Sequence, residues 1–123
     1  KCSPILIMGI GSDGHIASIF KNSKIFAKAT KKLGKKKILK TEKKIGSPAF
    51  KRLTMNFPLI LMSEKIIVVA QNKNKKKLLY KIMNNDSFYS NTAANILLKT
   101  AKSKIMIFNG IKLKSLQNFK YKV

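Results

Sequence analysis

The stretch that most constrains the fold is PILIMG, residues 4–9, a continuous apolar run that stops at a glycine. Such a run is typical of a strand in a parallel sheet, where helices cover both faces. Two more glycines follow at Gly11 and Gly14, so the chain can turn sharply directly after the strand. We therefore predict a strand buried on both faces, followed by a turn at the edge where α/β sheets bind ligands.

The rest of the chain alternates between short apolar runs and segments with helical spacing. The apolar runs predict further strands over residues 51–57, 65–70 and 104–109. The spacing predicts helices over residues 15–20, 23–30, 58–63, 76–84 and 91–101. Residues 21–47 are polar and lysine-rich, and we expect a long connection that passes over the site. This alternation predicts an α/β fold with a mainly parallel sheet.

Length and composition limit the chain to one domain at most. It has 123 residues, 45% of them hydrophobic, which is enough for a single core. No apolar run approaches the roughly 18 to 20 residues of a membrane span, and the first residues do not resemble a signal peptide. We therefore expect a cytoplasmic protein with no membrane partner. One cysteine, Cys2, and one histidine exclude an internal disulfide or zinc site.

The formal net charge is +23, and all but one of the 27 basic residues are lysine. Proteins that recognise bases rely heavily on arginine, and this chain has neither zinc-finger spacing nor interleaved aromatic residues. Abundant Lys, Ile and Asn are expected from an A- and T-rich coding sequence. We interpret the charge as a solvated cationic surface with no specific nucleic-acid partner. A cationic binding module without catalysis is the non-enzyme alternative.

Gly9, Gly11 and Gly14 have the G-x-G-x-x-G spacing of a dinucleotide-binding turn. That motif needs an acidic residue about 20 positions later for the ribose, but residues 25–41 contain no acid. The carboxylate of Asp13 would also repel a pyrophosphate in the turn. We therefore expect the glycines to bring a small substrate close to the backbone, without a nicotinamide cofactor.

The same turn carries a carboxylate and an imidazole, because Asp13 and His15 flank Gly14. An imidazole is the usual general base at neutral pH, and a neighbouring carboxylate can orient it. We interpret the two side chains as a candidate catalytic pair. A purely structural role for the single histidine is also compatible with these residues.

Residues 6–20, LIMGIGSDGHIASIF, closely resemble the block G-x-G-x-D-G-H-x-A-S-L-F of 6-phosphogluconolactonases. The related glucosamine-6-phosphate deaminases share D-G-H-I-A but continue with F-N-E-P, where this chain has Ser18, Ile19 and Phe20. That difference favours the lactonase, with a deaminase or isomerase of amino-sugar phosphates as the alternative enzyme.

Two later blocks are also similar to this family. SPAFKRLTMN resembles its strand R-[IVL]-T-[LM] and places Arg52 on the family arginine. IIVVAQNKNKKKLL resembles a strand followed by G-x-x-K and places Lys75 on the family lysine. Asn72 stands where the family has glycine, and asparagine tolerates a positive φ better than most residues.

The resemblance covers only the C-terminal half of the family. The S-G-G-x-T-P phosphate loop and the D-E-R block of the other half have no counterpart in this sequence. The resemblance therefore implies that residues 1–123 are a single partial domain. It implies a Rossmann-like, open sheet that is incomplete on its N-terminal side, and a missing half that completes the site.

The resemblance also implies a reaction, the hydrolysis of 6-phospho-D-glucono-1,5-lactone to 6-phosphogluconate in the oxidative pentose phosphate pathway. His15 would act as general base, and Asp13 would orient it. Gly11 and Gly14 would bring the substrate against backbone N–H groups.

The phosphate of the lactone would be bound by two basic residues. Arg52 would hold it through its bidentate fork and Lys75 as a point charge. Composition alone favours a solvated surface position for Lys75, so its assignment depends on the resemblance. No metal or organic cofactor is expected.

Overall fold

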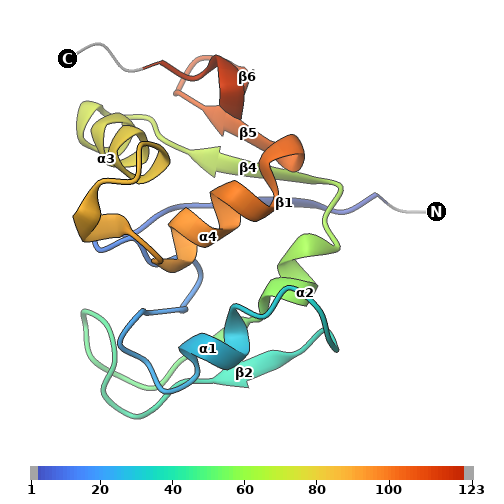
Figure 1. Ribbon diagram of the computed structural model, residues 1–123, viewed down its shortest axis with the longest axis vertical. Coiled ribbons are helices and arrows are strands. Elements are labelled where there is room, and N and C mark those ends of the chain that lie inside the picture. Colours follow the sequence, from blue (N-terminus) through green and yellow to red (C-terminus); the bar gives the residue numbers. More distant parts are fainter. Residues whose placement is uncertain (1–2, 121–123) are drawn as a thin grey trace.

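The computed structural model describes residues 3–120, so Cys2 lies outside the described residues (Figure 1). In this described part of the chain, four strands form one sheet in the order β1-β4-β5-β6. Strands β1, β4 and β5 are parallel, and β6 runs antiparallel to β5. Their bounds are β1 Ile5–Met8, β4 Lys65–Val69, β5 Ile105–Phe108 and β6 Leu113–Ser115. The mainly parallel α/β sheet predicted from the sequence is confirmed.

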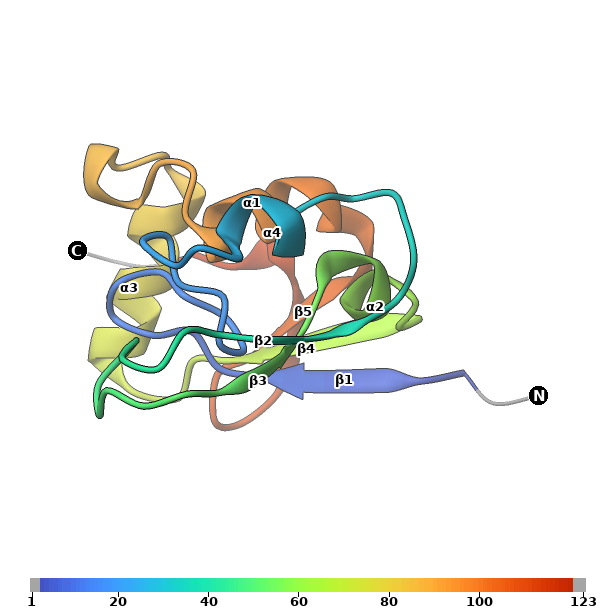
Figure 2. The same cartoon turned by 90° about the horizontal axis from the view of Figure 1, so that it is seen from below.

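Within residues 3–120, four α-helices accompany the sheet, and α1, α2 and α4 lie on the same side of it (Figure 2). Their bounds are α1 Phe26–Ala29, α2 Phe57–Leu61, α3 Lys73–Met83 and α4 Ala93–Thr100. Short 3₁₀ turns are formed by Ser87–Tyr89, Lys102–Lys104 and Leu116–Asn118. Asn56, Asn72 and Thr92 start α2, α3 and α4 by accepting a backbone N–H with their side chains. The predicted helices in these four places are confirmed.

A separate two-stranded ribbon is formed by β2 Ile38–Lys40 and β3 Leu53–Met55, which pair antiparallel. Strand β3 was expected, but β2 was not, because three residues among lysines are too few to show an alternating pattern. The Asn56 side chain fixes the ribbon, since it accepts the N–H of Lys37 and donates to the carbonyl of Lys35. The connection over residues 21–47 therefore contains regular structure of its own, namely α1 and β2.

The helix predicted over residues 15–20 is wrong. Ile16 and Ile19 form an isolated antiparallel bridge, and Ala17 between them has φ of +49°. Ser18 donates its N–H to Thr54 Oγ1 on β3 at 3.0 Å. Both isoleucines are buried. Their spacing of three residues looked helical, but a tight turn buries the same pair.

The prediction that the first strand is buried on both faces is also wrong. Met8 is buried, whereas Ile5 and Ile7 are 61% and 66% exposed. The core side chains of the neighbouring strands, such as Ile66 and Ile105, lie on the face of Met8. The helices thus cover one face of the sheet. Within residues 3–120, no helix is both long enough and apolar enough to cross a bilayer.

Candidate active site

The turn after β1 has a fixed shape and is docked on α4. Gly11 donates its N–H to the carbonyl of His15, and Gly14 donates to the carbonyl of Gly11, both at 2.9 Å. The carbonyl of Gly14 accepts the N–H of Ala94 at 3.0 Å, at the start of α4. Gly14 has φ of +86°, and a Cβ there would lie 2.8 Å from the Thr92 side chain. Gly14 is therefore required both by its conformation and by the close approach of α4.

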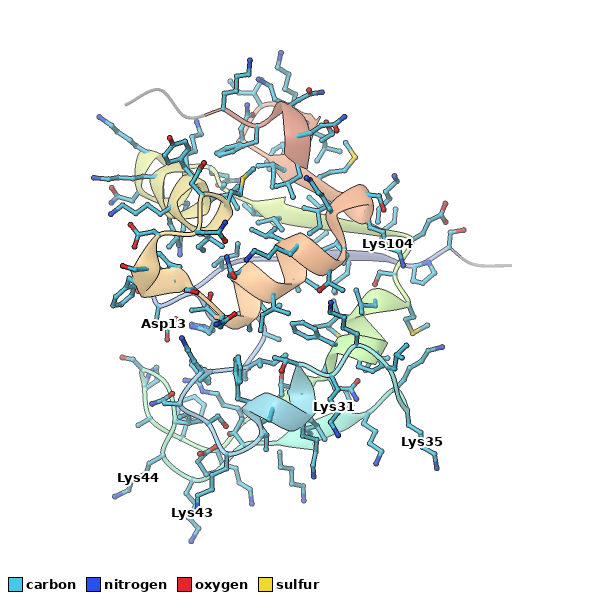
Figure 3. The ribbon with its side chains drawn as sticks, viewed as in Figure 1. Asp13, Lys31, Lys35, Lys43, Lys44 and Lys104 are labelled. Atoms are coloured by element: carbon cyan, nitrogen blue, oxygen red, sulfur yellow. The ribbon has the colours of Figure 1, made fainter. Side chains whose placement is uncertain are left out.

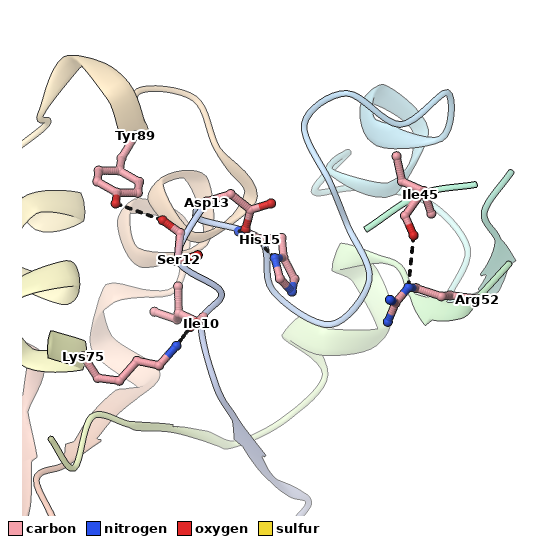
Figure 4. A network of polar contacts seen from close by, with 8 residues as sticks. All are labelled: Ile10, Ser12, Asp13, His15, Ile45, Arg52, Lys75 and Tyr89. Atoms are coloured by element: carbon pink, nitrogen blue, oxygen red, sulfur yellow. Dashed lines mark hydrogen bonds and ion pairs between the residues drawn. The ribbon is translucent and has the colours of Figure 1, made fainter. Parts of the chain in front are cut away.

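The turn brings the predicted pair into direct contact (Figure 4). Asp13 Oδ1 accepts the backbone N–H of His15 at 3.1 Å and also contacts Nδ1 of the imidazole. A carboxylate can only accept hydrogen bonds, so this contact places the ring proton of a neutral His15 on Nδ1. Nε2 then keeps its lone pair. The imidazole is therefore oriented as a general base requires.

The environment of Asp13 keeps its carboxylate ionised. Partial burial raises the pKa of Asp13, but the hydrogen bonds from the imidazole and the backbone N–H of His15 lower it. The lowering effects together outweigh burial, and the pKa lies below its ordinary value. Asp13 thus remains a charged acceptor for His15 at neutral pH.

The imidazole of His15 is held between Phe20 and Gly11. The rings of His15 and Phe20 have centroids 4.4 Å apart. A Cβ on Gly11 would lie 2.0 Å from Cε1 and 2.1 Å from Nδ1 of His15. Only glycine leaves room for the ring at this place. Gly11 therefore helps the site chiefly through the absence of a side chain.

Two side chains distant in the sequence hold the other side of the turn. Lys75 Nζ, on α3, donates to the carbonyl of Ile10 at 2.7 Å. Tyr89 Oη donates to the carbonyl of Ser12 at 2.9 Å, across 77 residues of sequence. Lys75, Ser12 and Tyr89 also line a cavity of about 310 Å³ beside the turn. Sequence reasoning missed Tyr89, because nothing in its neighbourhood in the sequence indicates this contact.

Arg52 lies on the opposite side of the Asp13–His15 pair from Lys75 (Figure 4). Its guanidinium lies 4.4 Å from the ring centroid of Phe50 and 5.6 Å from that of Phe20, the ring that contacts the imidazole. Arg52 also donates to the carbonyls of Ile45, at 3.4 Å, and Pro48, at 2.5 Å. The two basic residues predicted to bind phosphate are thus separated by the turn and bonded to main-chain carbonyls.

Asn72, which stands where the family has glycine, does not adopt a positive φ. Its φ is −99°, and its side chain accepts the N–H of Lys75 at 2.8 Å as the N-cap of α3. Asparagine is favoured there as a cap. The cap fixes the first turn of α3, from which Lys75 reaches Ile10. Among residues 3–120, no three His, Cys, Asp or Glu side chains gather in a way that could hold a metal ion.

The fold is similar to several solved structures. A 6-phosphogluconolactonase from Shewanella baltica matches with a TM-score of 0.70 and 20% identity, over 85% of this chain and 43% of that chain. A putative 6-phosphogluconolactonase from Neisseria gonorrhoeae matches with a TM-score of 0.61 and 25% identity, over 80% and 40%. A monomeric glucosamine-6-phosphate deaminase matches with a TM-score of 0.54 and 23% identity, over 84% and 43%.

The chain spans less than half the length of these three proteins. A comparison with curated proteins finds no match. The family described as glucosamine-6-phosphate isomerases/6-phosphogluconolactonase matches residues 3–106, which include the turn, both basic residues, strands β1 and β4 and the start of β5. The chain therefore belongs to the glucosamine-6-phosphate isomerase/6-phosphogluconolactonase family.

Proposed function

We propose that this chain carries the catalytic turn of a 6-phosphogluconolactonase, which hydrolyses 6-phospho-D-glucono-1,5-lactone to 6-phosphogluconate in the oxidative pentose phosphate pathway. The observation that supports this most is the contact between Asp13 and Nδ1 of His15 at the carboxyl end of β1. It leaves Nε2 of His15 able to take a proton from water. Hydrolysis of a lactone needs such a base and no redox chemistry.

The reaction can be written with this one base. His15 Nε2 takes a proton from water as the water oxygen bonds to the lactone carbonyl carbon, C1. The carbonyl oxygen becomes an oxyanion, which backbone N–H groups of the turn stabilise. When the carbonyl forms again, the bond between C1 and the ring oxygen breaks, and the imidazolium returns its proton to that oxygen. The negative charge of Asp13 stabilises the imidazolium between the two steps.

Arg52 and Lys75 bind the 6-phosphate in this proposal. An ammonium group has three N–H donors, so Lys75 can hold the Ile10 carbonyl and still donate to an anion. A guanidinium group has five N–H donors. Arg52 uses its Nε and Nη2 groups on the carbonyls of Ile45 and Pro48, so it also keeps donors for the phosphate. Because the two residues lie on opposite sides of the Asp13–His15 pair, we expect the phosphate to draw one of them toward the other.

In this proposal residues 1–123 form a single partial domain. The complete active site also includes residues that correspond to the part of the longer relatives outside the matched region. The test is a chimera in which this chain replaces the matched part of the Shewanella baltica protein. Its hydrolysis of 6-phosphogluconolactone is measured at neutral pH, after subtraction of spontaneous ring opening. Ammonia release from glucosamine 6-phosphate is measured in parallel.

The proposal predicts lactone hydrolysis above the spontaneous rate and no ammonia release. Ammonia release without lactone hydrolysis would instead identify an amino-sugar phosphate deaminase. Neither activity, with salt-sensitive binding to polyanions, would indicate a cationic binding module. The last two results each contradict the proposal.

A further inference from the structure

One buried ring, that of Phe20, contacts both the candidate base and one of the candidate phosphate-binding residues. Its centroid lies 4.4 Å from that of the His15 imidazole, a close aromatic contact. The guanidinium carbon of Arg52 lies 5.6 Å from the same centroid, within the range in which a cation is attracted to a ring. Only 3% of Phe20 is exposed. Phe20 therefore links two groups to which the proposed function gives separate tasks.

The packing around this link is tight. A Cβ on Gly46 would lie 2.8 Å from Cζ of Phe20 and 3.1 Å from both Nε and Nη2 of Arg52, so the backbone at Gly46 closes on both side chains. Lys43 and Lys44 of the same segment are exposed and extend outward (Figure 3), so Arg52 is the cation held against the ring. Because close packing leaves little free space, the guanidinium cannot shift far without moving Phe20.

A second ring contacts the same guanidinium and provides a comparison. The centroid of Phe50 lies 4.4 Å from the guanidinium carbon of Arg52, and Phe50 is 49% exposed. In the described part of the chain, the aromatic ring in contact with the imidazole of His15 is that of Phe20. Both phenylalanines therefore hold Arg52, but only through Phe20 does the contact continue to the base.

We propose that Phe20 is a positioning residue that couples phosphate binding at Arg52 to the orientation of His15. The inference rests on the proposed function, in which Arg52 binds the 6-phosphate of the lactone. A phosphate that draws the guanidinium also displaces the ring of Phe20, and the ring presses the imidazole against Asp13. Part of the binding energy of the phosphate is then used to hold Nε2 in place during the reaction, which raises kcat as well as lowering KM.

The first test compares Phe20→Leu with Phe50→Leu in the Shewanella baltica chimera, on 6-phosphogluconolactone and on glucono-1,5-lactone. Phe20→Leu should lower kcat for the phosphorylated lactone at least about tenfold more than for the other lactone, because only the phosphorylated lactone engages Arg52. Phe50→Leu should raise KM for the phosphorylated lactone by about threefold, because it loosens Arg52, and should change kcat by the same factor on both lactones.

Equal losses of kcat on the two lactones in Phe20→Leu would overturn the coupling, since Phe20 would then support only His15 or the fold. The same pattern of kcat in Phe50→Leu as in Phe20→Leu would also overturn it. Circular dichroism shows whether each variant is folded. Phe20→Met, which fills a similar volume without a ring, replaces Phe20→Leu in the comparison if the leucine variant unfolds.

The second test needs no activity. His15 is the only histidine of the chain, so in a ¹³C-histidine-labelled chimera its Cε1 signal is identified by its loss in His15→Gln. Saturating 6-phosphogluconate should shift this signal less in Phe20→Leu than in Phe50→Leu, and gluconate, which has no phosphate, should shift it little in either.

Equal shifts with 6-phosphogluconate in the two variants would overturn the proposal, because the phosphate would then act on His15 without Phe20. A chimera that shows the expected difference in shifts but hydrolyses neither lactone would contradict the proposed function and leave the coupling in place. Failure of the unmodified chimera to bind 6-phosphogluconate would contradict both.

Discussion

Gly11 lies directly against the imidazole of His15, so that a Cβ on residue 11 would stand 2.1 Å from the nitrogen that contacts Asp13. Gly9, two residues earlier in the same turn, has no atom within 4 Å of such a Cβ. The two glycines therefore form a matched pair for testing whether the orientation of His15 matters.

Gly11→Ala in the chimera should displace the ring from Asp13 and lower kcat for 6-phosphogluconolactone by about 10²-fold, the lower end of the range for a positioned base. Gly9→Ala should change kcat less than about threefold, because nothing has to move. Steady-state kinetics on the two variants checks this. Equal kcat values would mean that the position of the ring is not important for the reaction.

Asp13 should stabilise the fold in a pH-dependent way. Its pKa is lowered in the folded state, so its contribution is present above the unfolded pKa near 3.9 and is lost as pH falls through the lower folded value. The free energy of unfolding of the chimera, compared with that of Asp13→Asn by urea titration, should differ more at pH 5 than at pH 2.5. A difference that grows on acidification would show that burial dominates at Asp13.

Tyr89 should act as a positioning residue through the carbonyl of Ser12. Tyr89→Phe removes the donor to Ser12 but keeps the ring, which packs edge-on against Phe88 with centroids 4.9 Å apart. We expect kcat in the chimera to fall by about fivefold, as the loss of one hydrogen bond allows, with KM within about twofold of its original value. A change in KM alone would instead indicate that Tyr89 contacts the substrate.

Arg52→Lys should separate phosphate binding from a general need for positive charge. Lysine keeps the charge but loses the bidentate fork and the planar group stacked on Phe50, so KM for the phosphorylated lactone should rise by about tenfold. Lys51→Ala, at the exposed neighbouring position, should leave KM unchanged.

Glucono-1,5-lactone without its phosphate is the second substrate for this comparison. The hydrolysis of that lactone should be nearly unaltered by Arg52→Lys, because it has no phosphate to lose. Equal impairment on the two lactones would assign Arg52 to the fold or to the carbonyl chemistry.

The parts of the fold that follow from local sequence patterns were predictable. Strands β1, β4 and β5 and helices α3 and α4 were expected because their apolar residues recur with the period of a strand or a helix. The pairing of Asp13 with His15 was also expected, since two residues separated by one glycine in a turn lie close together.

The contacts that depend on tertiary structure were not predictable. The bonds from Lys75 to Ile10 and from Tyr89 to Ser12 join segments 65 and 77 residues apart, and no local pattern encodes them. The exposure of Ile5 and Ile7 also depends on tertiary structure. Their run of apolar residues indicates a strand covered on both faces, but which face is covered depends on where the helices pack.

The central claim is that the Asp13–His15 turn catalyses lactone hydrolysis, and the most direct measurement is the rate of 6-phosphogluconolactone opening by the chimera before and after His15→Ala. The account predicts a rate above spontaneous opening that falls by about 10² to 10⁴ in the variant, the usual range for a general base. Circular dichroism on both proteins confirms that the fold is unchanged. A loss of less than about threefold, in a variant that remains folded, would contradict the account because hydrolysis would then proceed without the imidazole.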